Sequence, residues 1–136
     1  MNLLVLDASI VMSWLFKEEG AQASTHIITF LQKGQAVVPE LWLTECLNVL
    51  AIAKRTRRLA PSDIEKSLGY LASLPILYDA FSAKILRETV YPMAIQYQLT
   101  TYDATYLELA KRRKLPLATL DKALRVAAKK EKITLL

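Results

Sequence analysis

The chain has 136 residues, 53% of them hydrophobic, with three glycines and five prolines, which fits one domain (residues 1–136) and excludes long disordered linkers. Its one cysteine, Cys46, excludes an internal disulfide, and no apolar run reaches the roughly 20 residues of a membrane span. Asp7 interrupts the apolar N-terminus and no basic residue precedes it, so we expect no signal peptide and a cytoplasmic location. The net charge of +5 favours a polyanionic partner.

Up to residue 57, the sequence predicts two buried strands and three helices. Residues 1–6 are almost continuously apolar and end at Asp7, which is typical of a buried strand in a parallel sheet. A second short strand is expected at residues 36–38. Apolar residues at helical spacing predict helices at residues 8–16, 22–32 and 41–57.

Beyond residue 57, two prolines mark expected helix boundaries. Ser62 and Glu65 follow Pro61 with the spacing of a capping box, so a helix is expected to begin there and to run to residue 74. Pro92 is expected to kink or split a helix over residues 82–98, because proline has no amide hydrogen. The other expected elements are helices at 101–114 and 121–129 and strands at 75–78, 117–120 and 133–135.

Apolar strands that alternate with helices predict an α/β fold, with a central parallel sheet of four to five strands and helices on both of its faces. In such sheets, ligands bind beyond the carboxyl ends of the strands. Asp7 and Asp121 each come directly after an expected strand. We therefore expect both carboxylates at the ligand-binding edge of the sheet.

Two further acids, Glu45 and Asp103, lie within or at the start of apolar helix patterns. An unpaired carboxylate in apolar surroundings costs several kcal/mol, so these two together with Asp7 and Asp121 indicate that a cation binds between them. The other 9 of the 13 acidic residues face 18 basic ones. An acidic pocket in a basic body is the arrangement that an enzyme cleaving a polyanion needs.

Mg²⁺ or Mn²⁺ is the cation that carboxylate ligands predict, because both are hard cations that prefer oxygen. Such an ion polarises a phosphoryl oxygen and generates hydroxide from bound water. His26 is the only histidine and Cys46 the only cysteine, so neither a metal-free histidine pair nor a zinc site of Cys and His is available. A phosphodiester-cleaving site therefore requires the carboxylates and their metal.

Four polar residues flank the acids and are candidates for orienting them or for contacting substrate. A hydroxyl two residues from Asp7 or Asp121 can reach a carboxylate or a metal-bound water. An amide one helical turn after Glu45 can orient that acid, and an aromatic ring beside Asp103 can stack on a base. These four residues are Ser9, Thr119, Asn48 and Tyr102.

Each acid also has a structural alternative that stays open. Asp is a favoured N-cap residue, so Asp7, Asp103 and Asp121 could each do no more than cap the helix that follows. Glu45 could form a salt bridge to a lysine or arginine. Asp79 lies in a polar segment and is expected to be solvated.

The acids occur in four sequence blocks: Leu4-Val5-Leu6-Asp7-Ala8-Ser9, Glu45-x-x-Asn48-x-Leu50, Tyr102-Asp103-Ala104-x-Tyr106-Leu107-x-Leu109-Ala110, and Leu115-Pro116-Leu117-Ala118-Thr119-Leu120-Asp121 with Leu124. In this order, the blocks resemble those of PIN-domain ribonucleases, and most closely the VapC-like toxins of toxin–antitoxin pairs. The resemblance covers nearly the whole chain, although residues 58–91 match only as helices.

The resemblance implies a PIN-like three-layer sandwich and an endoribonuclease that uses Mg²⁺ or Mn²⁺ to hydrolyse RNA. It also implies a homodimer and a cognate antitoxin that occupies the active-site groove. Within the site, it implies Asp7 and Asp103 as direct metal ligands, with Glu45 and Asp121 acting through water or a second ion.

Two other functions stay open beside this one. A non-catalytic PIN-like module would bind RNA without cleaving it, and a metal-dependent nuclease of the same design could act on DNA. A phospho-acceptor receiver domain is disfavoured, because it usually needs an acidic pair after its first strand and Ala8 follows Asp7 here.

Overall fold

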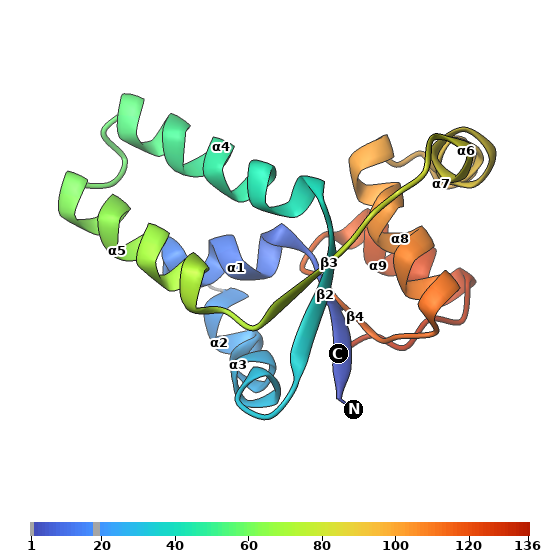
Figure 1. Cartoon of the computed structure of the whole chain (residues 1–136), viewed down its shortest axis with the longest axis horizontal. Helices are drawn as coiled ribbons and strands as arrows, with labels where there is room; N and C mark the ends of the chain where they lie inside the picture. The colour runs from blue at the N-terminus through green and yellow to red at the C-terminus, as the bar shows by residue number, and fades with distance from the viewer. Residues whose placement is uncertain (1, 18–19) are drawn as a thin grey trace.

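The computed structural model describes residues 2–17 and 20–136. Within them, a four-stranded parallel sheet has the strand order β3-β2-β1-β4. Val5 in the central strand pairs with Val37 on one side and with Leu117 on the other. The strands are β1 (Leu3–Leu6), β2 (Gln35–Pro39), β3 (Ile76–Asp79) and β4 (Leu117–Ala118). The expected parallel sheet with helices on both faces is therefore confirmed (Figure 1).

The helices from the first half of the chain cover one face of this sheet (Figure 1). The longest, α4, packs on β2, on α1 and on α5, and together α4 and α5 form an arm that projects from the sheet. The helices on this face are α1 (Ala8–Leu15), α2 (Gly20–Ala23), α3 (Thr25–Leu31), α4 (Leu41–Arg55) and α5 (Pro61–Ser73).

The helices from the second half cover the opposite face, with α8 at their centre. Helix α8 packs on β1, β2 and β4 and is flanked by α7 and α9. The helical elements on this face are α6 (Ala83–Ile85), a π-helical turn η1 (Leu86–Val90), α7 (Tyr91–Tyr97), α8 (Thr101–Arg113) and α9 (Lys122–Lys130).

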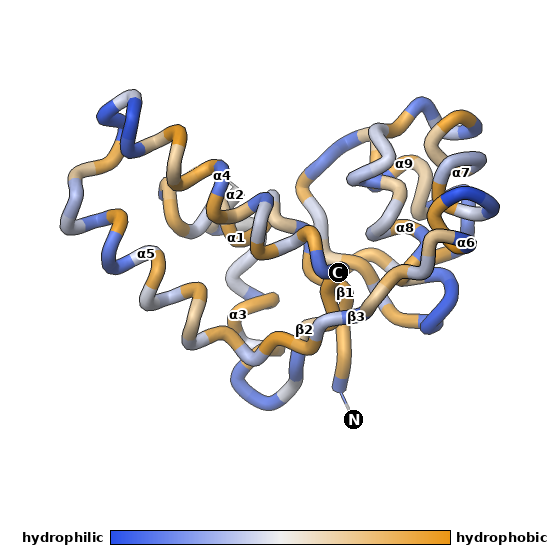
Figure 2. The backbone as a smooth tube through the Cα atoms, turned by 45° about the horizontal axis from the view of Figure 1, so that its top comes forward, coloured by the Kyte–Doolittle hydropathy of each residue, from blue (hydrophilic) through white to orange (hydrophobic). Residues whose placement is uncertain are grey.

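Hydrophobic segments from both halves of the chain converge on the sheet, and the turn between α4 and α5 is hydrophilic (Figure 2). Leu4, Val5 and Leu6 are fully buried because helices cover both faces of β1. Trp42 on α4 and Tyr106 on α8 are the largest fully buried side chains. The core therefore extends across the sheet from α4 to α8.

Two predictions about helices were wrong, and a third was not fully tested. The helix expected at residues 22–32 is broken into α2 and α3 near Ser24, whose hydroxyl accepts a hydrogen bond from Trp14. Ser62 is no cap: Pro61 occupies the first turn of α5 and Ala60 the N-cap position, because proline is preorganised for that turn. Pro92 does not end the helical stretch, since η1 runs directly into α7, but the α-helical pattern changes to a π turn just before the proline, which this wider turn accommodates.

Two strand predictions were too long. The strand expected at residues 117–120 ends at Ala118, because the hydroxyl of Thr119 accepts a hydrogen bond from the amide of Asp121 and turns the chain. The strand expected at residues 133–135 is reduced to a single bridge between Leu117 and Leu135. The first strand, expected at residues 1–6, is confirmed from Leu3, and Met1 lies outside the described residues.

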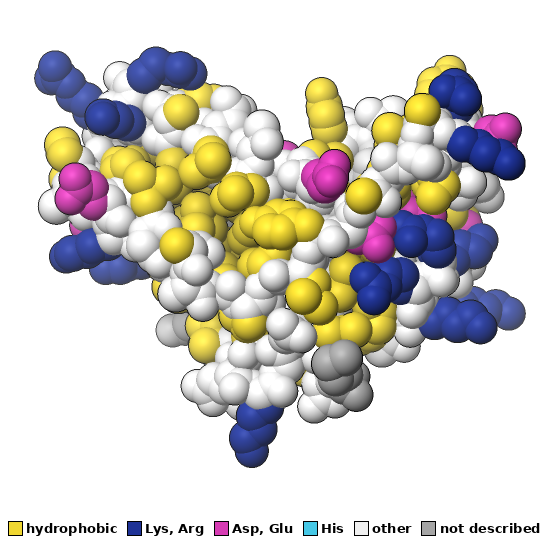
Figure 3. Space-filling model, viewed as in Figure 1, with side chains coloured by type: hydrophobic (Ala, Val, Ile, Leu, Met, Phe, Trp, Pro, Cys, Tyr) yellow, Lys and Arg dark blue, Asp and Glu magenta, His cyan; other side chains and the backbone are white. Residues whose placement is uncertain are grey.

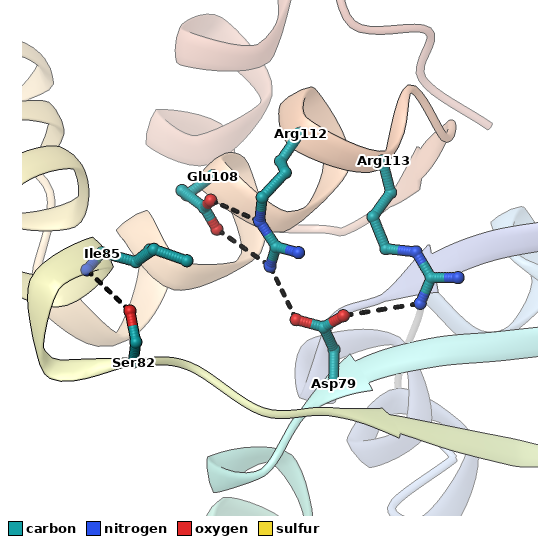
Figure 4. A network of polar contacts seen from close by, with 6 residues as sticks. All are labelled: Asp79, Ser82, Ile85, Glu108, Arg112 and Arg113. Carbon is teal, nitrogen blue, oxygen red and sulfur yellow. Dashed lines mark hydrogen bonds and ion pairs between the residues drawn. The ribbon is translucent and has the colours of Figure 1, made fainter.

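Asp79, at the end of β3, belongs to an ion network rather than to solvent, so that prediction was also wrong (Figure 4). Arg112 on α8 donates from its Nη2 to Asp79 Oδ2 at 2.6 Å and from its Nε to Glu108 Oε1 at 2.7 Å. Arg113 lies 3.5 Å from the other oxygen of Asp79. The network joins the edge strand β3 to α8, and Asp79 lies 33 and 34 positions from its two arginine partners, where local sequence patterns carry no signal.

Candidate active site

The four candidate acids reach the carboxyl edge of the sheet from four different elements. Asp7 follows β1 directly, and Asp121 follows β4 after two residues. Glu45 lies on α4, which begins just after β2, and Asp103 lies in the first turn of α8. Because β1 neighbours both β2 and β4, these elements place the carboxylates on one edge of the sheet.

The carboxylates lie within electrostatic range of one another. Burial raises the pKa of Asp7, which is 4% exposed, and the charge of Asp121 raises it further. Burial raises the pKa of Asp103 to about 6, with further contributions from Asp7 and Asp121. Burial and the charges of Asp7 and Asp103 likewise raise the pKa of Glu45. The structure thus brings all four acids into one cluster of negative charge.

Two hydroxyls hold the Asp7 carboxylate. Ser9 Oγ donates to Asp7 Oδ2 at 2.8 Å, and Thr119 Oγ1 donates to the same oxygen at 2.6 Å. Both hydrogen bonds lower the pKa of Asp7 and so partly oppose the effect of burial. Ser9 also accepts from the amide of Leu120, which ties the start of α1 to the end of β4. These contacts fix the orientation of Asp7 through one of its two oxygens.

Glu45 is partly buried and is held from the opposite side of the sheet. The Tyr106 hydroxyl, on α8, donates to Glu45 Oε1 at 2.6 Å. This hydrogen bond lowers the pKa of Glu45, whereas burial and the charge of Asp7 raise the pKa of Tyr106, so the phenol stays protonated. This role of Tyr106 was not predicted from the sequence. The available signal was a tyrosine on an apolar helix face, where a buried hydroxyl needs a partner.

The cap alternative holds for one of the three aspartates. Asp121 caps α9, since its Oδ1 accepts from the amide of Leu124 at 2.8 Å. Helix α8 is capped instead by Thr100, whose hydroxyl accepts from the Asp103 amide at 3.1 Å. Asp7 occupies the N-cap position of α1 but makes no side-chain cap hydrogen bond within the described residues. Helix capping therefore does not account for the placement of Asp7 or Asp103.

Asn48 and Tyr102 line a hollow of about 410 Å³ with Glu45, and Leu41, Thr44 and Val49 complete its wall. The ring of Tyr102 is 61% exposed, so a face of it is open to a ligand. Viewed as in Figure 1, the surface is notched between the α4–α5 arm and the α6–α8 side, with acidic side chains at the base of the notch and basic ones mostly on the outer margins (Figure 3). The notch therefore offers an acidic centre with basic surroundings.

A comparison with known protein families identifies the family of the chain. The model of the PIN domain matches residues 4–130 of the chain. The chain belongs to the PIN-domain family.

Two solved structures resemble this PIN domain over most of its length. The crystal structure of PAE2754 from Pyrobaculum aerophilum is 26% identical, with a TM-score of 0.65 over 93% of this chain and 79% of that chain. The crystal structure of VapBC2 from Rickettsia felis, bound to a DNA fragment from their promoter, is 14% identical, with a TM-score of 0.67 over 98% and 97%. No curated protein gives a significant match. In the described ranges, no helix of the PIN domain has both the length and the apolarity to cross a bilayer.

The donor set of this PIN domain fits a hard divalent cation held in an open shell. Within residues 2–17 and 20–136, no three His, Cys, Asp and Glu side chains lie close enough to enclose a cation by themselves. Mg²⁺ usually keeps several of its waters and is held by one or two carboxylates with substrate phosphates, so a closed protein cage is not needed. Asp7, Glu45 and Asp103, whose pKa values are raised, supply oxygen ligands together with Asp121, and the four carboxylates provide the negative charge.

Arg125 is a basic residue at this site that was not predicted from the sequence. From one turn into α9, its Nη1 donates to the carbonyl of Thr119 at 2.9 Å. Thr119 in turn bonds Asp7 through its side chain. The four-residue spacing from Asp121 was the available signal, because it places Arg125 on the same helical face as that acid.

Proposed function

We propose that this PIN domain is a Mg²⁺- or Mn²⁺-dependent endoribonuclease that acts as the toxin of a toxin–antitoxin pair. One observation carries the proposal: four carboxylates share a cluster, and no lysine or arginine in the described ranges forms an ion pair with any of them. Elsewhere in the fold, buried acids do have basic partners. A carboxylate cluster that has no lysine or arginine partner in its own chain is suited to bind a cation from solution.

Asp7 and Asp103 are the proposed direct ligands, and Glu45 and Asp121 act through water or a second ion. The bound metal would polarise the scissile phosphate and supply hydroxide from its water. Ser9 and Thr119 orient Asp7, so its carboxylate does not have to reorganise when the substrate binds.

Asn48, Tyr102 and Arg125 are the proposed contacts to the nucleic acid. Asn48 and Tyr102 line the hollow beside Glu45, where the exposed ring of Tyr102 can stack on an unpaired base. The guanidinium of Arg125 has N–H groups beyond the one on Thr119, and these can donate to a phosphate. This combination of stacking and charge suits single-stranded RNA.

The toxin role rests on the resemblance of the four acid blocks to VapC-like toxins and on the structural likeness to VapBC2 from Rickettsia felis. With that role we propose a cytoplasmic homodimer inhibited by a cognate antitoxin. The reading frames next to the gene are the direct check: a neighbouring frame that encodes a protein binding this chain and blocking its cleavage supports the role. A chain without such a partner would be a nuclease of another kind.

Cleavage assays on single-stranded RNA and DNA, with Mg²⁺, with Mn²⁺ and with EDTA, test the activity. We expect wild type to cleave RNA internally only when a metal is present, and Asp7→Asn to be inactive but folded. Asp63→Asn is a control for the loss of one carboxylate, because Asp63 is exposed in the first turn of α5. Cleavage that survives EDTA would exclude the metal mechanism, DNA cleavage alone would exclude the RNA substrate, and binding without cleavage would identify a non-catalytic module.

A further inference from the structure

Two of the four acids have a carboxylate anchored by groups on the same edge of the sheet, whereas Glu45 depends on a distant group. Asp7 is held by two hydroxyls and Asp121 accepts from the amide of Leu124, while Thr100 caps the helix that carries Asp103 by accepting from its backbone amide. Glu45 comes from α4, on the face of the sheet opposite α8. In the part of the chain that the structure describes, its side-chain hydrogen bond is the one from Tyr106.

Tyr106 lies where it can set the position of that carboxylate. Its side chain is 0% exposed, and its hydroxyl meets Glu45 Oε1 at 2.6 Å across 61 positions of sequence. It is also on α8, one turn after Asp103, so a single rigid helix carries both a candidate ligand and the group that holds another. The Tyr106–Glu45 hydrogen bond therefore links the acid on α4 to the acid on α8.

We propose that Tyr106 is a positioning residue that fixes the Glu45 carboxylate toward the cation, an inference that rests on the proposed metal-dependent function. A glutamate has three side-chain torsions, and ordering such a side chain costs conformational entropy. The hydrogen bond from the fully buried Tyr106 orders the Glu45 side chain before a cation binds. One carboxylate oxygen is held by the phenol, and the other is available for a metal-bound water.

The substitution Tyr106→Phe tests this, because it removes one oxygen and keeps the packed ring. The fold supplies a matched control: Tyr97 makes the same kind of phenol–carboxylate hydrogen bond, donating to Glu131 Oε1 at 2.7 Å. We expect Tyr106→Phe to weaken Mn²⁺ binding about tenfold or more, as measured by calorimetry and by electron paramagnetic resonance of free Mn²⁺. Tyr97→Phe should leave Mn²⁺ binding within about twofold of wild type, because Glu131 lies outside the acid cluster.

A double-mutant cycle with Glu45→Gln separates positioning from a general loss of packing. If Tyr106 acts through Glu45, then Tyr106→Phe weakens Mn²⁺ binding no further in the Glu45→Gln background. A second tenfold loss in that background, or unchanged binding in the single variant, overturns the inference. Replacing Tyr106 with p-aminophenylalanine keeps a hydrogen-bond donor, so we expect it to restore affinity to within about threefold, and a loss as large as that of phenylalanine also overturns it.

The same measurements distinguish failure of this inference from failure of the proposed function. Wild type that binds Mn²⁺ but cleaves no RNA contradicts the proposed function, while the Mn²⁺ affinities still decide the role of Tyr106. Wild type that binds no Mn²⁺ contradicts both. Wild type that binds Mn²⁺ and cleaves, with an unaltered Tyr106→Phe variant, contradicts only the positioning role.

Discussion

Helix α8 carries two acids in opposite electrostatic surroundings, five residues apart. Glu108 is 3% exposed and lies in the ion network with Arg112, which also binds Asp79 (Figure 4). Asp103, one and a half turns earlier, faces Asp7 and Asp121, and no basic side chain of the described chain forms an ion pair with it. The same helix therefore supplies its own cation for one acid and leaves the other to a ligand.

The pKa directions express this difference. The pKa of Arg112 is raised by its hydrogen bonds to Glu108 and Asp79, and that of Glu131 is lowered by Tyr97 and Lys111, so these ionised forms are stabilised by folding. The pKa of Asp103 is raised to about 6, so its ionised form opposes folding. Acids that have a partner within the fold (compensated acids) thus stabilise it. Acids without a basic partner (uncompensated acids) lower its stability and form a binding site.

The sharpest test of this comparison is catalytic. Asp103→Asn should reduce RNA cleavage about 10³-fold, because loss of a metal ligand removes several kcal/mol of transition-state stabilisation and each 1.4 kcal/mol corresponds to about tenfold in rate. Glu108→Gln should keep cleavage within about fivefold of wild type when measured well below its unfolding temperature. Equal losses of cleavage in the two variants would show that the acid cluster and the ion network do not differ in function.

The next effect concerns stability, and here the substitution of Glu108, not of Asp103, should be the damaging one. Glu108→Gln should lower the free energy of unfolding by about 2 kcal/mol, less than the roughly 3–5 of a fully buried pair, because the Arg112 side chain stays 35% exposed. Urea unfolding measures the change. Lys111→Gln is the control, since Lys111 is 54% exposed in its pair with Glu131 and should contribute under about 1 kcal/mol. A Glu108 variant as stable as wild type would remove the structural role of the network.

The sequence could predict the cluster of acids that have no basic partner. Asp7 and Asp121 follow short apolar runs, and the parallel topology that those runs predict brings strand ends to one edge. The acids themselves stand out locally, because each one lies next to an apolar run or within an apolar helix pattern. The parallel sheet and both of its helical layers could also be predicted, because they depend on the periodic spacing of apolar residues.

The ion network around Asp79 could not be predicted, because Asp79 and its arginine partners are distant in sequence. Asp79 looked solvated in its own segment, and only the packing of β3 beside α8 brings Arg112 to it. The hydrogen bond from Tyr106 to Glu45 likewise depends on α4 and α8 meeting at the sheet edge. The cap of α8 could not be assigned from the sequence, because Thr100 and Asp103 both have side chains that cap helices, and backbone geometry decides between them.

Metal addition should affect only the uncompensated cluster. At a Mn²⁺ concentration tenfold above its dissociation constant, binding to the native state adds about 1.4 kcal/mol and should raise the unfolding temperature by about 5 °C. Asp103→Asn should lose this shift, and Glu108→Gln should show it from a lower starting temperature. Differential scanning fluorimetry with a Ca²⁺ arm and an EDTA arm provides the measurement. A shift that persists in Asp103→Asn would place the cation elsewhere.

The smallest expected effect is the dependence of stability on pH without metal. The folded-state pKa of Asp103 lies at about 6 against an ordinary value of 3.8, so the folded chain holds this proton more tightly than the unfolded chain. The contribution of Asp103 to stability therefore falls as pH rises from about 4 to 6, and it stays low above pH 6. Asparagine cannot ionise, so Asp103→Asn should be more stable than wild type at pH 8 and equal to it near pH 4.

We expect this gain at pH 8 to be about 1 kcal/mol, because Asp103 is half-buried and solvent screens part of its repulsion with Asp7 and Asp121. Urea unfolding in EDTA at pH 4, 6 and 8 measures it, and Asp63→Asn controls for a change of charge at an exposed helix start. Saturating Mn²⁺ at pH 8 should reverse the order of stability, because only wild type then gains a cation for its carboxylates. If Asp103→Asn is less stable than wild type at pH 8 in EDTA, Asp103 already has a compensating partner within the fold, and the contrast with Glu108 disappears.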